Sequence, residues 1–268
     1  MDSESLSFDN MTALYDETRT WDDKCFSAAL DYLEARFPPA RFRKVFEPGI
    51  GNGRITIPLA GRGYDVTGVD ISSEMLSLLH DRMLGHPHLA NITFLKADVT
   101  SLPFPDAEFD MTVVVHLFYF IPDWKTAVDE LTRVIKPGGS LILMHTGSGQ
   151  EIPEINQRYK ELCADLGFTI NQMGVSSTSE VVQYLQESGR TVALIQDRWR
   201  WTTHIQIKRA LQYMQHRAYS FTTLAPDAIH HEALARLSKE LINRYGNMNT
   251  VLEIPNQISL AIIANQKV

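Results

Sequence analysis

Short apolar runs alternate with amphipathic stretches along the first 150 residues of the chain. Apolar positions two apart or in succession predict buried strands, whereas spacings of three and four predict helices. We therefore expect strands at residues 44–48, 64–70, 91–98, 110–116 and 140–146. Helices are expected at 26–37, 53–60, 73–84 and 124–135. This alternation predicts a doubly wound α/β fold, with a mostly parallel sheet covered by helices on both faces.

The pattern changes after Thr146, where longer helical stretches replace the short strand–helix units. Further helices are expected at 153–166, 178–187, 205–219 and 227–244, and further strands at 190–204 and 251–265. Pro255 has no backbone N–H and predicts a bulge in the last strand. The insertions 147–177 and 205–249 are predicted to form a helical cap over the carboxyl edge of the sheet and to line an acceptor pocket there.

The composition is that of a globular chain with a sizeable core, since 44% of its 268 residues are hydrophobic and 21% are charged. The net charge of −7 argues against a nucleic-acid or anionic-membrane surface. The longest apolar run, residues 111–121, contains His116 and is too short to span a membrane. The first ten residues are acidic and lack the apolar segment of a signal peptide. We expect a cytoplasmic protein that binds neither nucleic acid nor membrane.

A glycine-rich turn, EPGIGNG at residues 47–53, follows the first expected strand. Glycines at alternate positions allow a tight turn and the close approach of a ligand to the backbone. In a doubly wound sheet such a turn lies at the carboxyl ends of the strands, where these folds bind ligands. Arg54 follows Gly53 and breaks the G-x-G-x-x-G spacing of dinucleotide sites, and the carboxylate of Glu47 suits a ligand with a cationic amine.

Two further carboxylates follow the next two expected strands. Asp70 is placed to accept hydrogen bonds from both hydroxyls of a ribose, and Asp98 from an adenine amino group. Together with the glycine-rich turn, they describe a ligand with an amino-acid end, a ribose and an adenine, and with no pyrophosphate. Each also has a purely structural interpretation, because Asp70 could cap the next helix and Asp98 could belong to a turn.

In this order and spacing, the sequence resembles the class I S-adenosylmethionine-dependent methyltransferases of the small-molecule type. The segments that carry the resemblance are FEPGIGNGR, VTGVDIS, LKADVTSLPFPDAEFDMTVVVHLF and LTRVIKPGGSLIL, within residues 44–146. The resemblance implies a seven-stranded sheet with a reversed last strand, and S-adenosyl-L-methionine bound across strands one to four. It also implies that residues 15–19, YDETR, form a flap over the cofactor, although an exposed turn is the alternative.

The predicted site contains one set of cofactor-binding residues and a smaller catalytic set. The cofactor-binding set is Tyr15, Arg19, Glu47, Gly49, Gly51, Asn52, Gly53, Asp70, Ile71, Met75, Asp98, Val99 and His116. The catalytic candidates are His116, Tyr119 and His204, which could take a proton from the acceptor if it needs deprotonation. No metal is expected.

The acceptor is expected to be a small molecule. The turn after the fourth strand, residues 116–119, has no Pro-Pro pair of the kind found in enzymes that methylate exocyclic amines of bases. Aromatic and histidine side chains could line the acceptor pocket: Trp199, Trp201, Tyr213, Tyr219, Phe221, His145 and His204. Two alternatives stay open at this point, a nicotinamide-dependent oxidoreductase on a related fold and a protein that binds the methyl donor without transferring methyl.

The chain is expected to form a single methyltransferase domain over residues 1–268, acting as a monomer or homodimer. Four parts are expected in order: an N-terminal flap and helix at 1–42, a cofactor-binding core at 43–146, a helical cap with the sixth strand at 147–250, and the last strand at 251–268.

Overall fold

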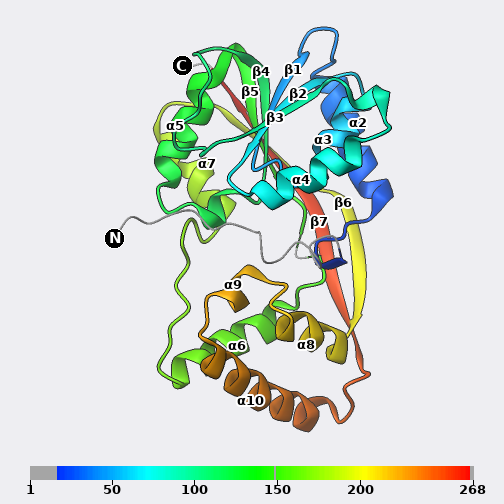
Figure 1. Ribbon diagram of the computed structural model, residues 1–268, viewed down its shortest axis with the longest axis vertical. Coiled ribbons are helices and arrows are strands. Elements are labelled where there is room, and N and C mark those ends of the chain that lie inside the picture. Colours follow the sequence, from blue (N-terminus) through cyan, green and yellow to red (C-terminus); the bar gives the residue numbers. More distant parts are fainter. Residues whose placement is uncertain (1–16, 148, 266–268) are drawn as a thin grey trace.

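A seven-stranded sheet forms the centre of the molecule (Figure 1). The computed structural model describes residues 17–147 and 149–265. The strands are β1 (Lys44–Pro48), β2 (Asp65–Asp70), β3 (Ile92–Lys96), β4 (Phe109–Val115), β5 (Ile135–His145), β6 (Val192–Gln206) and β7 (Val251–Ala264). Their order is β3-β2-β1-β4-β5-β7-β6, and β7 runs antiparallel to both of its neighbours, β5 and β6. The predicted mostly parallel sheet with a reversed last strand is confirmed.

Helices flank this sheet and also form a separate group beyond it. They are α2 (Asp23–Arg36), α3 (Thr56–Ala60), α4 (Ser73–Met83), α5 (Trp124–Val134), α6 (Pro153–Asp165), α7 (Thr178–Glu187), α8 (Ile207–Gln215), α9 (Ser220–Thr223) and α10 (Asp227–Tyr245). The side chains of Asp22, Ser72 and Asp123 accept the N-terminal N–H groups of α2, α4 and α5, as N-cap residues do.

Alternating side chains of the strands build two apolar layers, one on each face of the sheet. On one face, Met111 and Val113 pack with α2 and α3 through Leu30 and Leu59. On the other face, Val114 of the same strand packs with α5 and α7. Because strand side chains point to opposite faces in turn, one apolar strand supplies both layers.

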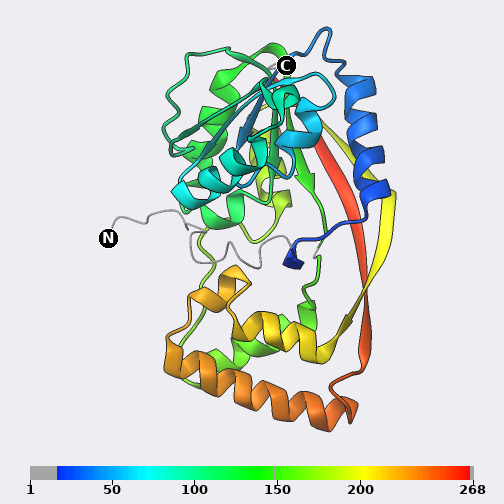
Figure 2. The ribbon, with the colours of Figure 1, turned by 45° about the vertical axis from the view of Figure 1, so that its right-hand side comes forward.

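The last two strands extend beyond the rest of the sheet and carry the cap (Figure 2). Helices α6, α8 and α10 lie together beyond the carboxyl edge of the sheet and share an apolar core with Ile205 and Ile254 from the ends of β6 and β7. Tyr159, Tyr213 and Tyr219 are buried in this core. The predicted helical cap is therefore present, held at a fixed position by two paired strands.

The structure corrects three details of the expected elements. The bulge lies in β6 between Ile195 and Trp199, where Asp197 has a φ of 64°, while Pro255 pairs regularly with Thr202. Helix α7 packs on the sheet beside α5 and is not part of the cap. Helix α3 begins only at Thr56, after an irregular turn. No helix within the described residues is long and apolar enough to cross a membrane.

Candidate functional site

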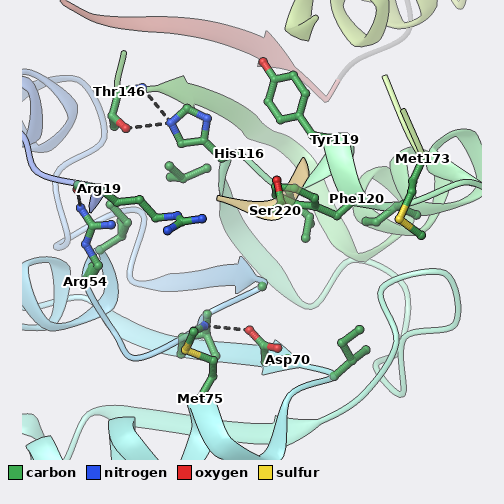
Figure 3. Close-up of a pocket in the computed structure, with 18 of the residues that line it drawn as sticks. Arg19, Arg54, Asp70, Met75, His116, Tyr119, Phe120, Thr146, Met173 and Ser220 are labelled. Carbon is green, nitrogen blue, oxygen red and sulfur yellow. Dashed lines mark hydrogen bonds between the residues drawn. The ribbon is translucent and has the colours of Figure 1, made fainter. Parts of the chain in front are cut away.

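A cavity of about 480 Å³ lies between the carboxyl ends of the parallel strands and the cap. This volume is typical of sites for cofactors and small molecules. Among the predicted residues, those that line it are Arg19, Glu47, Gly49, Gly51, Asn52, Asp70, Ile71, Met75, Asp98, Val99, His116 and Tyr119. Asp70 and Met75 lie on one side of this cavity, and His116 and Tyr119 lie across from them (Figure 3). Tyr15 lies outside the described residues.

The glycine-rich turn after β1 has left-handed backbone conformations, with φ of 66° at Gly49, 53° at Gly51 and 84° at Gly53. A Cβ atom at Gly49 would lie 2.8 Å from Leu117, and one at Gly53 would lie 2.5 Å from Leu79. At Gly51 a Cβ would meet only the carbonyl oxygen of Gly49, at 4.0 Å. Two of the glycines are therefore required by packing, whereas Gly51 leaves open space where a ligand can approach the backbone.

Asp70 ends β2 and holds this turn in place. Its Oδ2 accepts a hydrogen bond from the N–H of Gly51 at 2.9 Å, and its Oδ1 accepts one from the N–H of Ser72 at 2.8 Å. The carboxylate thus connects the turn after β1 with the start of α4. It borders the cavity as well, so it is positioned both to organise the turn and to contact a ligand.

Glu47 places a buried carboxyl group beneath the same turn, with only 3% of the residue exposed. The hydroxyl of Thr56 donates a hydrogen bond to its Oε2. Burial raises the pKa of Glu47 to about 8, and the charge of Asp70 acts in the same direction, while Thr56 and Arg54 oppose it. A ligand ammonium group would favour the ionised form, so this wall of the cavity fits a ligand with a cationic amine.

Asp98 follows β3 at the far end of this wall. Its Oδ1 accepts hydrogen bonds from the N–H and the hydroxyl of Thr100, at 2.9 and 2.8 Å. The buried side chain of Met75 and the neighbouring Val99 supply an apolar surface beside it. An acceptor oxygen next to an apolar surface suits a flat base with an amino group, so the adenine assignment of Asp98 stays a geometrically reasonable prediction.

The segment before α2 joins the sheet to the cap. The Arg54 guanidinium donates to the carbonyl of Arg19 and stacks on the ring of Trp21, 3.9 Å from its centroid. Arg19 in turn donates to the carbonyl of Ala218 in the cap, at 3.3 Å. Figure 3 shows both arginines at one end of the cavity. The two guanidinium groups therefore make that end positive, as a ligand carboxylate requires.

His116 follows β4 with a φ of 51° and lies beside His145, which ends β5; the two ring centroids are 4.9 Å apart. Its Nε2 accepts a hydrogen bond from the N–H of Thr146 at 3.3 Å and lies 2.8 Å from the Thr146 hydroxyl (Figure 3). Burial lowers the pKa of His116 to about 3, and His145 adds to this effect. His116 is therefore a neutral wall residue, and its geometry does not favour the proton-transfer role suggested by the sequence.

Tyr119 belongs to the turn that closes the cavity on the other side. Its hydroxyl lies 3.1 Å from that of Thr178, and its carbonyl accepts a hydrogen bond from the N–H of Gly174 at 3.1 Å. A Cβ at Gly174 would lie only 1.9 Å from the carbonyl oxygen of Phe118. This close backbone contact fixes residues 170–173, which line the cavity.

The structure corrects the prediction for His204, which does not line the cavity. Its side chain is 58% exposed, and its Nε2 lies 3.5 Å from Glu253 on the neighbouring strand. Trp199 is buried beneath α2 and does not line the cavity either. Of the aromatic and histidine side chains expected to line the acceptor pocket, only Phe221 and His145 do so.

Several residues that line the cavity were not predicted from the sequence. They are Trp21 and Arg54 near the flap, and Glu151, Lys160, Met173 and Ser220 on the cap side. The cap residues lie on separate elements with no common spacing, so no sequence pattern marks them. Within the described residues, no group of three or more His, Cys, Asp or Glu side chains is placed to hold a metal ion.

The arrangement is similar to that of known methyltransferases. Residues 46–143 match the family model described as "Methyltransferase domain". A demethylmenaquinone methyltransferase from Clavibacter sepedonicus is 28% identical over 188 residues, which cover 69% of this chain and 74% of that protein. The chain spans about half the length of several other curated methyltransferases that it matches.

Solved structures share the fold over most of the chain. The YcgJ protein from Bacillus subtilis superposes with a TM-score of 0.57 at 20% identity, covering 88% of this chain and 97% of that one. The [4+2]-cyclase SpnF superposes with a TM-score of 0.54 at 15% identity, covering 93% of this chain and 85% of that one. At these identities the likeness establishes the fold, and the chemistry has to be argued from the site.

Proposed function

We propose that this chain is an S-adenosylmethionine-dependent methyltransferase that transfers the methyl group to a small-molecule acceptor held under the cap. One observation carries the proposal. A single cavity reaches from the glycine-rich turn and Asp70 to residues of the cap, among them Lys160, Ser220 and Phe221. Donor and acceptor can therefore occupy one enclosed space, as a direct displacement requires.

The residues of the sheet edge fit the methyl donor. We assign Glu47 to its ammonium group, Arg19 to its carboxylate, Asp70 to its ribose and Asp98 to its adenine. When bound, S-adenosyl-L-methionine supplies an activated methyl group on a sulfonium. The protein's own contribution is to orient the acceptor and exclude water, and well-oriented groups reach effective molarities of about 10⁵–10⁸ M.

The cap half of the cavity suits a small acceptor. We assign residues 43–146 to cofactor binding, the cap helices to acceptor binding, and the segment before α2 to the flap. The relative from Clavibacter sepedonicus is a demethylmenaquinone methyltransferase, which supports an acceptor with an apolar body. A cytoplasmic location, the absence of nucleic-acid binding and a monomeric or homodimeric state stay predictions.

Calorimetry and turnover test the proposal in two steps. We expect micromolar binding of S-adenosylmethionine and S-adenosylhomocysteine, on the order of −8 kcal/mol, and no comparable binding of NADH. Tight binding of NADH alone would overturn the proposal and favour the oxidoreductase alternative. Methyl transfer to members of an acceptor library, followed with methyl-labelled donor, then separates an enzyme from a protein that only binds the donor. This second step is necessary because the fold also occurs in a cyclase.

A further inference from the structure

Glu151 is a carboxylate on the acceptor side of the cavity that the assignments above do not use. It lies between β5 and α6, and the backbone just before it is held by hydrogen bonds. Gln150 donates its N–H to the carbonyl of Thr18 at 3.2 Å, and its own carbonyl accepts from the hydroxyl of Tyr219 at 3.1 Å. The N–H of Gly149 donates to Asn256 at 3.1 Å. The carboxyl group of Glu151 is thus held at one place in the cavity wall.

One oxygen of this carboxyl group is held by the protein, and the other is available. Its Oε2 accepts a hydrogen bond from Nδ2 of Asn156 at 2.9 Å. Its Oε1 accepts none from the residues that the structure describes. The amide of Asn156 therefore orients the group and leaves one oxygen to accept a proton or a hydrogen bond from a molecule in the cavity.

The neighbouring histidines do not offer such an acceptor. Nε2 of His116 is engaged by Thr146, and Nδ1 of His145 accepts a hydrogen bond from the N–H of Gly147 at 3.2 Å. In its neutral form each ring then carries its proton on the other nitrogen and presents a donor there. Burial lowers the pKa of both histidines, so neither ring readily gains a second proton.

The charges around Glu151 indicate the kind of acceptor group. Two cations, Arg19 and Lys160, lie near enough to act on its ionisation. The Lys160 ammonium lies 5.1 Å from the ring centroid of Phe221 and forms no ion pair with any described residue. Arg19 is assigned to the carboxylate of the donor, so Lys160 is the cation left for the acceptor, where it disfavours a cationic group and stabilises an oxygen that becomes negative. Burial raises the pKa of Glu151 against the effect of both cations, which makes its carboxylate a stronger base.

We propose, on the basis of the function inferred above, that Glu151 is the general base of the reaction and that the acceptor is a neutral hydroxyl compound. The apolar side chains of Ile170, Met173, Phe221 and Leu224 also line the cavity and suit an aromatic or otherwise apolar body. A phenol or enol fits this combination of an apolar body and a hydroxyl that is too weak a nucleophile when protonated.

The proposed step conserves atoms and charge. The hydroxyl proton passes to Oε1 of Glu151 as the acceptor oxygen forms its bond to the methyl carbon. The bond between that carbon and sulfur breaks, and its electron pair goes to sulfur, which becomes a neutral thioether. No oxidant, reductant or metal takes part. Lys160 is placed to stabilise the negative charge on the oxygen during this step.

Two phenols of different acidity, phenol and 4-nitrophenol, test the proposal together with aniline as an amine probe. At a pH where 4-nitrophenol is ionised and phenol is not, only phenol needs a base. We expect wild-type protein to methylate both phenols in preference to aniline. Glu151→Gln should lower kcat for phenol by about 10²–10⁴-fold and lower that for 4-nitrophenol far less. In wild-type protein, kcat/KM for phenol should rise with pH on the acidic side of the pH profile. This rise should disappear in Glu151→Gln.

Glu154→Gln is the matched control, because Glu154 lies in the first turn of α6 with a 72% exposed side chain paired to Arg244. It should behave as wild type. Calorimetry with S-adenosylhomocysteine should give Kd values within about threefold for all three proteins. An equal loss for both phenols, or a large loss of cofactor affinity, would assign Glu151 a structural role and overturn the proposal.

Preference for aniline, or no turnover of any probe by protein that binds the cofactor, would also overturn it. Failure of wild-type protein to bind the donor at all would instead overturn the proposed function, so the two failures are distinguishable.

Discussion

The carboxylate of Asp70 accepts a hydrogen bond from the N–H of Gly51 at 2.9 Å and so ties the end of β2 to the turn after β1. The residue assigned to the ribose is therefore also part of the scaffold that shapes the glycine-rich turn. The position of Asp70 at a strand end would by itself predict that Asp70→Ala leaves the fold intact. The hydrogen bonds to Gly51 and Ser72 change that expectation.

Replacement of Asp70 should lower both cofactor affinity and stability. Asp70→Ala removes the acceptor for two backbone N–H groups and for the ligand, whereas Asp70→Asn keeps one side-chain oxygen. Hydrogen bonds to a charged group contribute about 1.5–3 kcal/mol, so we expect Asp70→Ala to lose more than tenfold in affinity for S-adenosylhomocysteine. Its Tm should fall as well, and Asp70→Asn should be intermediate in both measurements. Unchanged affinity in Asp70→Ala would refute the ribose assignment.

Two glycines of the turn should respond differently to alanine. Both have positive φ, so each alanine carries backbone strain of about 1 kcal/mol. At Gly53 the added Cβ also meets Leu79 at 2.5 Å, whereas at Gly51 it meets only open cavity. Thermal unfolding should therefore show a larger loss of stability in Gly53→Ala than in Gly51→Ala. In calorimetry, Gly51→Ala should lose more cofactor affinity than its loss of stability accounts for. The opposite ranking would mean that the cofactor does not lie against Gly51.

The two histidines predicted as catalytic should also separate. His204 faces solvent and Glu253, so His204→Ala should change neither turnover nor cofactor affinity more than about twofold. His116→Ala removes the partner of the Thr146 N–H in a buried wall, which should cost about 1–3 kcal/mol of unfolding free energy. Denaturant unfolding measures the loss of stability in His116→Ala, and a methyl-transfer assay measures the turnover of His204→Ala. A large loss of turnover in His204→Ala would restore its assignment to the acceptor side.

The alternation of apolar residues was sufficient to predict the sheet, because β4 and β5 are apolar on both faces and N-caps mark three helices. The same alternation of apolar residues in β6 also predicts the correct orientation of the His204 side chain. Trp199, Trp201 and Ile205 alternate on the inward face of β6, which places His204 on the outward face. Proximity in sequence to the cap suggested a catalytic role, but strand parity decides where the side chain points.

Glu151 illustrates what the sequence cannot provide. In the sequence, a glutamate two residues before Pro153 is indistinguishable from the start of an ordinary exposed helix. Its place in the cavity depends on contacts of the two preceding residues with Thr18, Tyr219 and Asn256, which lie roughly 70 to 130 residues away in the sequence. Long-range packing of this kind leaves no local pattern, whereas the glycine-rich turn and Asp70 form part of a compact βαβ unit.

Cofactor binding should be coupled to the ionisation of Glu47. Burial raises its pKa to about 8, so the group is mostly protonated at pH 6–7 in the free protein. A bound ammonium group favours the carboxylate, so binding should release close to one proton in this range. Affinity for S-adenosylhomocysteine should then rise with pH, by up to about tenfold per unit, between pH 5.5 and 7, where the ligand's amine stays charged. Calorimetry in buffers of different ionisation enthalpy measures the released proton directly.

The same group makes the unliganded fold pH-dependent, with a definite sign. A pKa that is higher in the folded protein than the ordinary value of 4.5 means that the folded state binds the proton more tightly. The contribution of Glu47 to stability is therefore full below pH 4.5 and is lost as the pH rises toward 8, at up to about 1.4 kcal/mol per unit. Glu47→Gln, which cannot ionise, should lose both this slope and the proton release. Proton release that persists in Glu47→Gln would place the ligand's amine against a different group.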